Sequence, residues 1–262
     1  MCGWLTLLRA AEAAPSPEVG RLAAEVRPLG WVAFSARSPR GDWDIYAMRP
    51  DGADVRNLTN APETEDFYPL FSRDGRQLLY RSMPRGQTVS GNDYGRQGRP
   101  MLARANGAEA KPLGEDGALP WATWSPDGRQ LLTLQPRGFG IVDLATKQVV
   151  RSFPRGGFYQ QPTWSPDGRA VVGVSNGFDT GWSIARLELA TQRANAVSVA
   201  DCCTPDWSAG GEHVVFSRRR PHGGENGGYG WTELWQARPD GTERRSEERR
   251  VGKECVSTCR SR

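Results

Sequence analysis

The sequence predicts an all-β fold, a β-propeller of four-stranded antiparallel blades, with about five blades present over residues 29–244. Three observations predict it: a turn motif that occurs four times, spacings of 53, 40 and 43 residues between its copies, and apolar runs of strand length on both sides of each copy. Four short strands at a period of about 40 residues are typical of propeller blades.

The repeated unit is an aromatic residue and a serine, then a turn and a second apolar run. Its serines fall at positions 72, 125, 165 and 208, and the last copy is degraded. In the best copies proline sets φ for the first corner of the turn, aspartate tolerates the second, and glycine supplies a positive φ. We therefore expect the flanking runs to pair as a hairpin, with the aromatic in a core shared with the neighbouring blade.

Further strands complete each unit. The third strands are predicted at residues 43–48, 101–105, 139–144, 182–189 and 231–237, and outer strands at residues such as 55–59 and 147–152. Residues 31–35 align with the second strands of the other units. The first visible blade is therefore expected to begin within its own repeat, and only four first strands are expected.

The copy of the motif at residues 162–168 reads Pro-x-Trp-Ser-Pro-Asp-Gly, and Asp44-Ile45-Tyr46 is followed by Asn57-Leu58-Thr59. With these motifs the chain resembles, over residues 29–244, the TolB-like propeller family, whose repeats resemble WD-repeat blades. The resemblance implies a propeller that is complete with six blades. The chain departs from the pattern at Arg73 and Ala122, which replace prolines, and at Gly210, which replaces aspartate.

Three segments are predicted. Residues 1–28 are an N-terminal segment, either a clipped signal peptide, since an apolar run leads into an Ala-x-Ala pattern, or a linker or helix. Residues 29–244 are the blades. Residues 245–262 resemble a translated sequencing adapter and are expected to be an artefactual disordered tail, so the protein is expected to be truncated by at least one blade. A propeller that lacks a blade exposes strand edges and tends to aggregate.

Charge and hydropathy exclude two classes of function. The tail carries six Lys/Arg and three Glu, which leaves 28 basic and 27 acidic residues elsewhere. Residues 1–244 are therefore nearly neutral and lack the excess of positive charge that binding to nucleic-acid phosphates requires. No apolar run reaches the roughly 18 residues of a membrane span.

No catalytic or cofactor-binding constellation is found. Gly173–Gly177 matches the Gly-x-Ser-x-Gly elbow of hydrolases, but Ser175 occupies the strand end that Ser35, Ser82 and Ser217 hold in other units. With His213 and His222 as the only histidines, a histidine-based triad or metal site is not expected. We predict no cofactor, no metal ligand and no enzyme activity.

Cysteine usage does not indicate a disulfide framework, because the five cysteines are odd in number and none has Cys-x-x-Cys spacing. Cys202 and Cys203 are adjacent, so they form either two buried thiols, which the residue type favours, or a strained vicinal disulfide.

A ligand face is predicted from loop lengths. The loops between second and third strands vary most, at residues 84–99 and 218–230, and insertions gathered on one face often mark a binding face. Residues that precede the inner strands should surround the channel mouth there. The candidate ligand-binding residues are Glu65, Asp66, Tyr68, Trp121, Tyr159, Gln160, Asp201 and Cys202. Their mixture of aromatic, amide and carboxylate groups suits a peptide or a small polar ligand.

The function expected from these observations is a non-catalytic TolB-like propeller that binds a protein, a peptide or a small polar ligand at its loop-rich face. We expect it in the periplasm or cell envelope, otherwise in the cytoplasm, and as a monomer when complete. The alternative is the propeller domain of a prolyl-oligopeptidase-like serine peptidase whose catalytic domain is missing. A third possibility is a propeller lyase or hydrolase with a channel metal.

Overall fold

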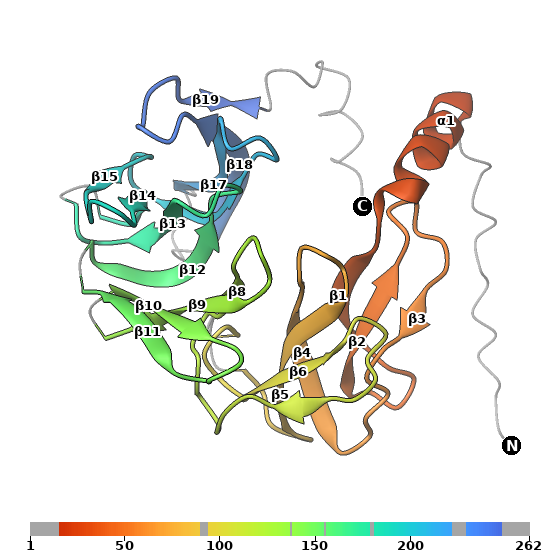
Figure 1. The fold of residues 1–262 in the computed structure, drawn as a ribbon. Helices are drawn as coiled ribbons and strands as arrows, with labels where there is room; N and C mark the ends of the chain where they lie inside the picture. Colours follow the sequence, from red (N-terminus) through yellow and green to blue (C-terminus); the bar gives the residue numbers. More distant parts are fainter. Residues whose placement is uncertain are drawn as a thin grey trace, which may run out of the picture.

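The computed structural model describes residues 16–89, 94–136, 138–154, 156–178, 181–221 and 229–247. They form five small antiparallel sheets, each a propeller blade, arranged in chain order along an arc (Figure 1). The predicted fold class is confirmed.

Blades 2 to 5 each contain four strands in sequence order from the inside outward, whereas blade 1 contains three. Blade 1 is formed by β1 (Val32–Arg37), β2 (Trp43–Met48) and β3 (Arg56–Asn57). Blade 2 is formed by β4 (Thr64–Phe71), β5 (Gln77–Pro84), β6 (Arg99–Arg104) and β7 (Lys111–Pro112). Blade 3 is formed by β8 (Thr123–Trp124), β9 (Gln130–Gln135), β10 (Gly138–Asp143) and β11 (Val149–Phe153). Blade 4 is formed by β12 (Phe158–Trp164), β13 (Ala170–Ser175), β14 (Ser183–Glu188) and β15 (Ala194–Ala196). Blade 5 is formed by β16 (Cys202–Trp207), β17 (Val214–Pro221), β18 (Tyr229–Ala237) and β19 (Arg245–Ser246).

The turn between the first and second strands repeats one hydrogen-bond pattern. In blade 3 the Ser125 hydroxyl donates to Asp127 at 2.7 Å and accepts from the Gln130 amide at 3.0 Å, while the Gly128 amide donates to the Ser125 carbonyl at 3.0 Å. Gly128 has φ +70°, which explains the glycine. Blades 2 and 4 have the same bonds at Ser72 and Ser165. The sequence motif is therefore a closed hairpin turn.

The aromatic residue before each serine packs between blades, as predicted. Trp124 is 7% exposed and lies in a cluster with Leu70 and Leu79 of blade 2. Its indole Nε1 donates to the Leu70 carbonyl at 3.0 Å, and Trp207 of blade 5 donates to Thr163 of blade 4 at 3.4 Å. The aromatic thus supplies apolar area to the preceding blade, and in blades 3 and 5 it also donates one hydrogen bond to it.

Blade 1 explains the second sequence motif, Asp44-Ile45-Tyr46 with Asn57-Leu58-Thr59. Asp44 is fully buried and accepts hydrogen bonds from the Asn57 amide at 2.6 Å and from the Ala61 backbone at 3.1 Å. The Thr59 hydroxyl accepts from the Ile45 amide at 3.0 Å, and Ser198 does the same for Ile184 in blade 4. The motif therefore ties the outer strand to the third strand.

The arc remains open between its two ends. Consecutive blades pack sheet on sheet, but no comparable packing joins blade 5 to blade 1 among the residues that the structure describes. Figure 1 shows blade 1 and the blue strands of blade 5 at opposite ends of the arc. As predicted, β1 aligns with the second strands, so the first blade has no inner strand within the described ranges.

The chain ends of the described region lie outside the blades or at their rim. Helix α1 (Pro17–Val26) is capped by the Ser16 hydroxyl, is followed by the 3₁₀ turn η1 (Arg27–Leu29), and buries none of its side chains. At the other end β19 pairs with β18, Arg245 opposite Gln236, so the last blade extends two residues past the expected boundary at 244. The export-like segment and residues 248–262 lie outside the described residues. No helix in the described region is both long and apolar enough to span a bilayer.

Candidate functional site

The inner strands β4, β8, β12 and β16 lie along the inner side of the arc, around an axis that we call the channel axis and that has two ends. We call the end at the Ser72, Ser125, Ser165 and Ser208 turns the turn face. We call the opposite end, where the β5–β6 loop and the connections between blades lie, the loop face. The sequence prediction placed the ligand at the loop face.

At the loop face, an aromatic cluster involves two of the predicted residues. Tyr68 and Trp121 meet edge to face at 5.5 Å between ring centroids, and Tyr94 of the β5–β6 loop contacts both, at 5.4 and 4.9 Å. Trp121 has no exposed surface. Burial also raises the pKa of Tyr68. Both residues are therefore packed against the chain itself.

A repeated backbone feature directs these side chains. Tyr68, Trp121, Gln161 and Thr204 each stand four residues before a repeat serine, and their φ values are +56°, +53°, +49° and +49°. A left-handed φ at a non-glycine residue costs of order 1–3 kcal/mol. Three of the four coincide with a register shift in the inner strand. The bulge carries the side chain at this position inward, where Gln161 donates to the Tyr94 hydroxyl at 2.9 Å and accepts from the Thr204 amide at 2.7 Å.

The β5–β6 loop is fastened across the loop face. The Gly95 carbonyl accepts from the Trp121 amide at 2.5 Å, and a Cβ added to Gly95 would lie 2.2 Å from the Trp121 ring. Arg96 donates to the Tyr159 carbonyl of blade 4 at 2.8 Å. Buried Arg81 anchors the base of the loop. Its guanidinium donates to the main-chain carbonyls of residues 96, 97, 98, 118 and 119.

Glu65 and Asp66 lie at the junction of blades 1 and 2. Glu65 accepts from the backbone amides of Trp43, at 2.7 Å, and Gly86, at 3.1 Å. Asp66 is 1% exposed, and its Oδ1 has no hydrogen-bond partner among the described residues. Burial raises its pKa more than the nearby hydroxyl groups lower it.

The remaining predicted residues do not join them in one pocket. Tyr159 packs against the core of blades 4 and 5, where burial raises its pKa to about 12, and Gln160 is half-buried beside it. Asp201 is exposed, whereas Cys202 is fully buried. Cys202 and Cys203 are both free thiols, and burial raises the pKa of Cys202 to about 11. Of the two alternatives that the sequence left open, the structure agrees with two buried thiols and not with a vicinal disulfide.

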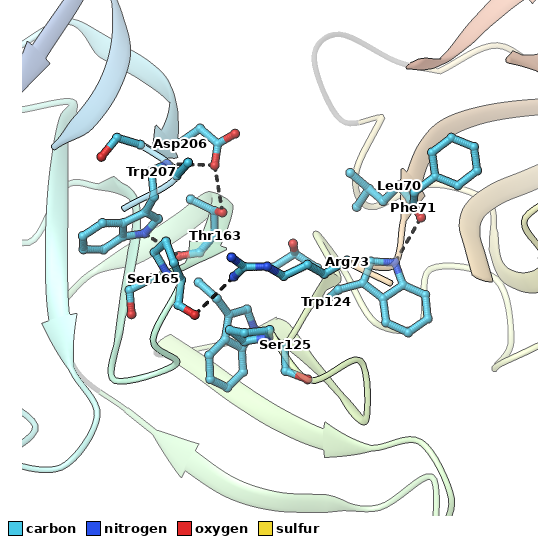
Figure 2. Close-up of a pocket in the computed structure, with 15 residues that line it drawn as sticks. Leu70, Phe71, Arg73, Trp124, Ser125, Thr163, Ser165, Asp206 and Trp207 are labelled. Atoms are coloured by element: carbon cyan, nitrogen blue, oxygen red, sulfur yellow. Dashed lines mark hydrogen bonds between the residues drawn. The ribbon is translucent and has the colours of Figure 1, made fainter. Parts of the chain in front are cut away.

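The turn face holds a cavity that sequence reasoning missed (Figure 2). It has a volume of about 370 Å³ and is bordered by the ends of all four inner strands. Its walls are formed by three indole side chains, small polar residues and the prolines of two turns. The lining residues are Leu70, Phe71, Arg73, Thr123, Trp124, Ser125, Pro126, Thr163, Trp164, Ser165, Pro166, Asp206, Trp207, Ser208 and Ala209.

Arg73 crosses this cavity. It occupies the turn position held by Pro126, Pro166 and Ala209 in the other blades. Figure 2 shows its side chain reaching from blade 2 toward blade 4, where the guanidinium donates to the Pro166 carbonyl at 3.2 Å. In the sequence, the one sign of this role of Arg73 was that it replaces the proline of the turn motif.

A second cavity, about 530 Å³, lies between residues 29–31 and blades 1 and 2, and Arg73 also borders it. The Trp31 ring there stacks with the guanidinium groups of Arg49, at 4.1 Å, and Arg56, at 4.7 Å. The turn-face cavity, by contrast, is lined by residues of four blades.

The catalytic motifs considered in the sequence have structural roles. Ser175 ends β13, its hydroxyl donates to the Gly156 carbonyl, and no helix follows it within the described residues. His213 sits beside β17 with its backbone amide bonded to Ser208, while His222 lies outside the described residues. No group of three His, Cys, Asp or Glu side chains in the described part of the chain could hold a metal ion.

Comparison with known proteins gives the fold. No protein-family model and no curated protein matches the sequence. Among solved structures, TolB from Acinetobacter baumannii superposes with a TM-score of 0.63 at 16% identity, over 83% of this chain and 52% of that one. The putative TolB from Agrobacterium tumefaciens gives 0.55 at 16% identity, over 82% and 79%. The chain has the fold of a TolB-type propeller.

A puromycin hydrolase also matches, with a TM-score of 0.53 at 18% identity, over 82% of this chain and 35% of that one. This chain thus spans about half of the Acinetobacter TolB and about a third of the hydrolase. The resemblance to TolB-type propellers inferred from the sequence motifs is confirmed at the level of the fold.

Proposed function

We propose that this TolB-type propeller is a non-catalytic binding protein that takes a peptide or a small polar ligand into its turn-face cavity. One observation carries the proposal: a cavity of about 370 Å³ on the channel axis, with a cationic side chain inside it. Ligand pockets typically have volumes of about 300–1,000 Å³ and mostly apolar walls with a few polar groups. The volume of the cavity lies in that range, and its lining combines three indoles with Arg73, Asp206 and several hydroxyl groups.

The packing at the loop face supports this choice of end. Tyr68 and Trp121 already contact Tyr94, and Gln161 is bonded to the same tyrosine. A ligand at the loop face would have to displace these contacts. A ligand at the turn face enters a space that the chain does not fill.

The test is to block the cavity. Ala209 lines it and is exposed, so Ala209→Phe adds a ring there without disturbing the core. The control Ala145→Phe adds the same ring at an exposed turn of blade 3, outside the cavity. Titration calorimetry with a random tripeptide library should give binding to the unmodified chain and to Ala145→Phe but not to Ala209→Phe. Equal binding by all three would refute the cavity as the site.

A second candidate is the propeller domain of a serine peptidase, which the likeness to puromycin hydrolase supports at the level of the fold. The two candidates differ in what lies in the complete open reading frame. A downstream nucleophile elbow with aspartate and histidine partners would favour the peptidase, and a frame that closes the propeller alone would favour the binding protein.

We further propose that the complete protein closes its ring with at least one more blade, is monomeric, and works in the bacterial periplasm or cell envelope. The open arc between blades 5 and 1 supports the extra blade. The export-like run before Pro15 supports the location. Fusion of residues 1–28 to alkaline phosphatase, which is active only after export, tests the location, and a fusion without activity would contradict it.

A further inference from the structure

We propose that the turn-face cavity recognises a free carboxylate, held by the guanidinium of Arg73. This inference rests on the proposed binding function and names the chemistry of its ligand. The carboxylate could belong to the C-terminus of a peptide or to a small free acid, and both present the same group to Arg73.

Most N–H donors of Arg73 have no partner among the described residues. A guanidinium carries five N–H donors in a planar fork. The one partner that Arg73 contacts among the described residues is the Pro166 carbonyl, and no carboxylate of the described region lies within ion-pair distance of it. Bidentate pairing with a carboxylate is the interaction that this fork fits best.

Arg73 differs from other turn arginines in its position within the turn. Arg76 and Arg169 follow the turn glycines, point into solvent with side chains more than 80% exposed, and lie 3.8 and 3.9 Å from the aspartate of their own turn. Arg73 is exposed as well, but it lines the turn-face cavity and stands at the position where the other turns have proline or alanine. The turn does not need a charge there, because Pro126, Pro166 and Ala209 form it without one.

The guanidinium shares its cavity with aromatic side chains and one acidic side chain. Trp124, Trp164 and Trp207 contribute indole surface to the same cavity, which gives a ligand an apolar wall beside the guanidinium. Asp206, on the blade 5 wall, accepts from the Thr163 hydroxyl at 3.3 Å and from the Trp207 amide at 2.8 Å. No cation of the described residues pairs with it. A carboxylate that carries a neighbouring N–H or ammonium group, as amino acids and peptide C-termini do, therefore finds a complementary acceptor.

The experiment compares two random tripeptide libraries, one with free C-terminal acids and one with C-terminal amides, with sodium acetate as a third probe. Binding is measured by calorimetry and by the fluorescence of the cavity tryptophans. We expect the acid library to bind about 10-fold to 100-fold more tightly than the amide library, as charge-assisted hydrogen bonds are typically worth. Competition by acetate would identify a small acid as sufficient, and its failure would point to a peptide C-terminus.

The variants assign the effect to the residue. Arg73→Ala introduces the residue that blade 5 already has, so it should fold, and it should reduce acid binding to the level of the amide. Arg76→Ala, in the same turn but outside the cavity, should leave binding unchanged. Acid and amide binding that are equal, or an unchanged affinity in Arg73→Ala, would overturn the carboxylate site while leaving cavity binding intact. If Ala209→Phe loses binding while Arg73→Ala keeps it, the cavity is the site but the carboxylate contact is refuted. If neither library binds the unmodified chain, both proposals are overturned.

Discussion

The side-chain amide of Gln161, on the inner strand of blade 4, donates a hydrogen bond to the hydroxyl of Tyr94, in the β5–β6 loop of blade 2, at 2.9 Å. The same amide accepts from the Thr204 backbone of blade 5 at 2.7 Å. One side chain thus links three blades and holds a loop over the end of the channel that the sequence had suggested for ligand binding.

Gln161→Ala should therefore destabilise the propeller. The loss of two hydrogen bonds at a half-buried site predicts a decrease of about 1–3 kcal/mol in the free energy of unfolding. Chemical denaturation measures it, and hydrogen exchange should increase at residues 94–98. The matched control is Gln160→Ala, because the Gln160 side chain has no hydrogen-bond partner among the described residues; its effect should stay within about 0.5 kcal/mol. Equal effects of the two substitutions would contradict the link.

The indole hydrogen bond between blades predicts a difference between two tryptophans of the same motif. Trp124 donates to Leu70, whereas Nε1 of Trp164 is buried with no partner in the described part of the chain. Both can be changed to phenylalanine, the residue that blade 2 has at position 71. Trp124→Phe should cost about 1 kcal/mol more than Trp164→Phe, because only the first loses a hydrogen bond and leaves a carbonyl unpaired. Thermal unfolding of both variants measures this difference. Equal destabilisation, or a larger loss in Trp164→Phe, would show that the indole hydrogen bond is unimportant.

The degraded turn of blade 5 can be repaired. Its Ser208 hydroxyl reaches Glu212 at only 3.5 Å, whereas the other turns have a serine–aspartate bond of 2.6–2.7 Å. Gly210→Asp alone should not help, since a Cβ at residue 210 would lie 2.3 Å from a Glu212 oxygen and two carboxylates would meet. Gly210→Asp combined with Glu212→Arg restores the motif and should raise the melting temperature by about 2–4 °C. A single substitution that matches the double would argue against the proposed conflict.

Asp66 and Asp74 should make the stability of the fold depend on pH in opposite directions. Burial raises the pKa of Asp66 above 3.8, so the folded state holds its proton more tightly, and the stability gained at low pH is lost as pH rises through the folded pKa. The Ser72 hydroxyl bond lowers the pKa of Asp74 below 3.8, so the stability it contributes is lost as pH falls through that value. Relative to the unmodified chain, Asp66→Asn should gain stability and Asp74→Asn should lose it between about pH 3 and about pH 7. Melting temperatures across this range that run parallel for all three proteins would contradict both assignments.

The fold could be predicted because its determinants are local. Each turn is closed by residues within five positions of Ser125 or its equivalents, and the adjacent apolar runs set the strand pairs. The expected missing strand of blade 1 also followed from a local alignment of residues 31–35.

The candidate site could not be predicted to the same degree, because its determinants connect residues far apart in sequence. Sequence reasoning included Tyr68 and Trp121 among the candidates but not Tyr94, which contacts both rings and is bonded to Gln161 across 67 positions. It placed the candidate at Gln160 rather than Gln161, because a bulge in the inner strand shifts the register by an amount that alternation does not reveal. Arg73 appeared only as a departure from a motif, and its reach to Pro166 spans 93 positions.

The most direct test is a crystal structure of the chain with the tightest-binding acid tripeptide. We expect density for the peptide in the turn-face cavity, with carboxylate oxygens about 2.7–2.9 Å from the nitrogens of Arg73 and with Tyr94 still bonded to Gln161. A peptide bound instead at the loop face, beside Tyr68 and Asp201 with the β5–β6 loop displaced, would contradict the proposed site.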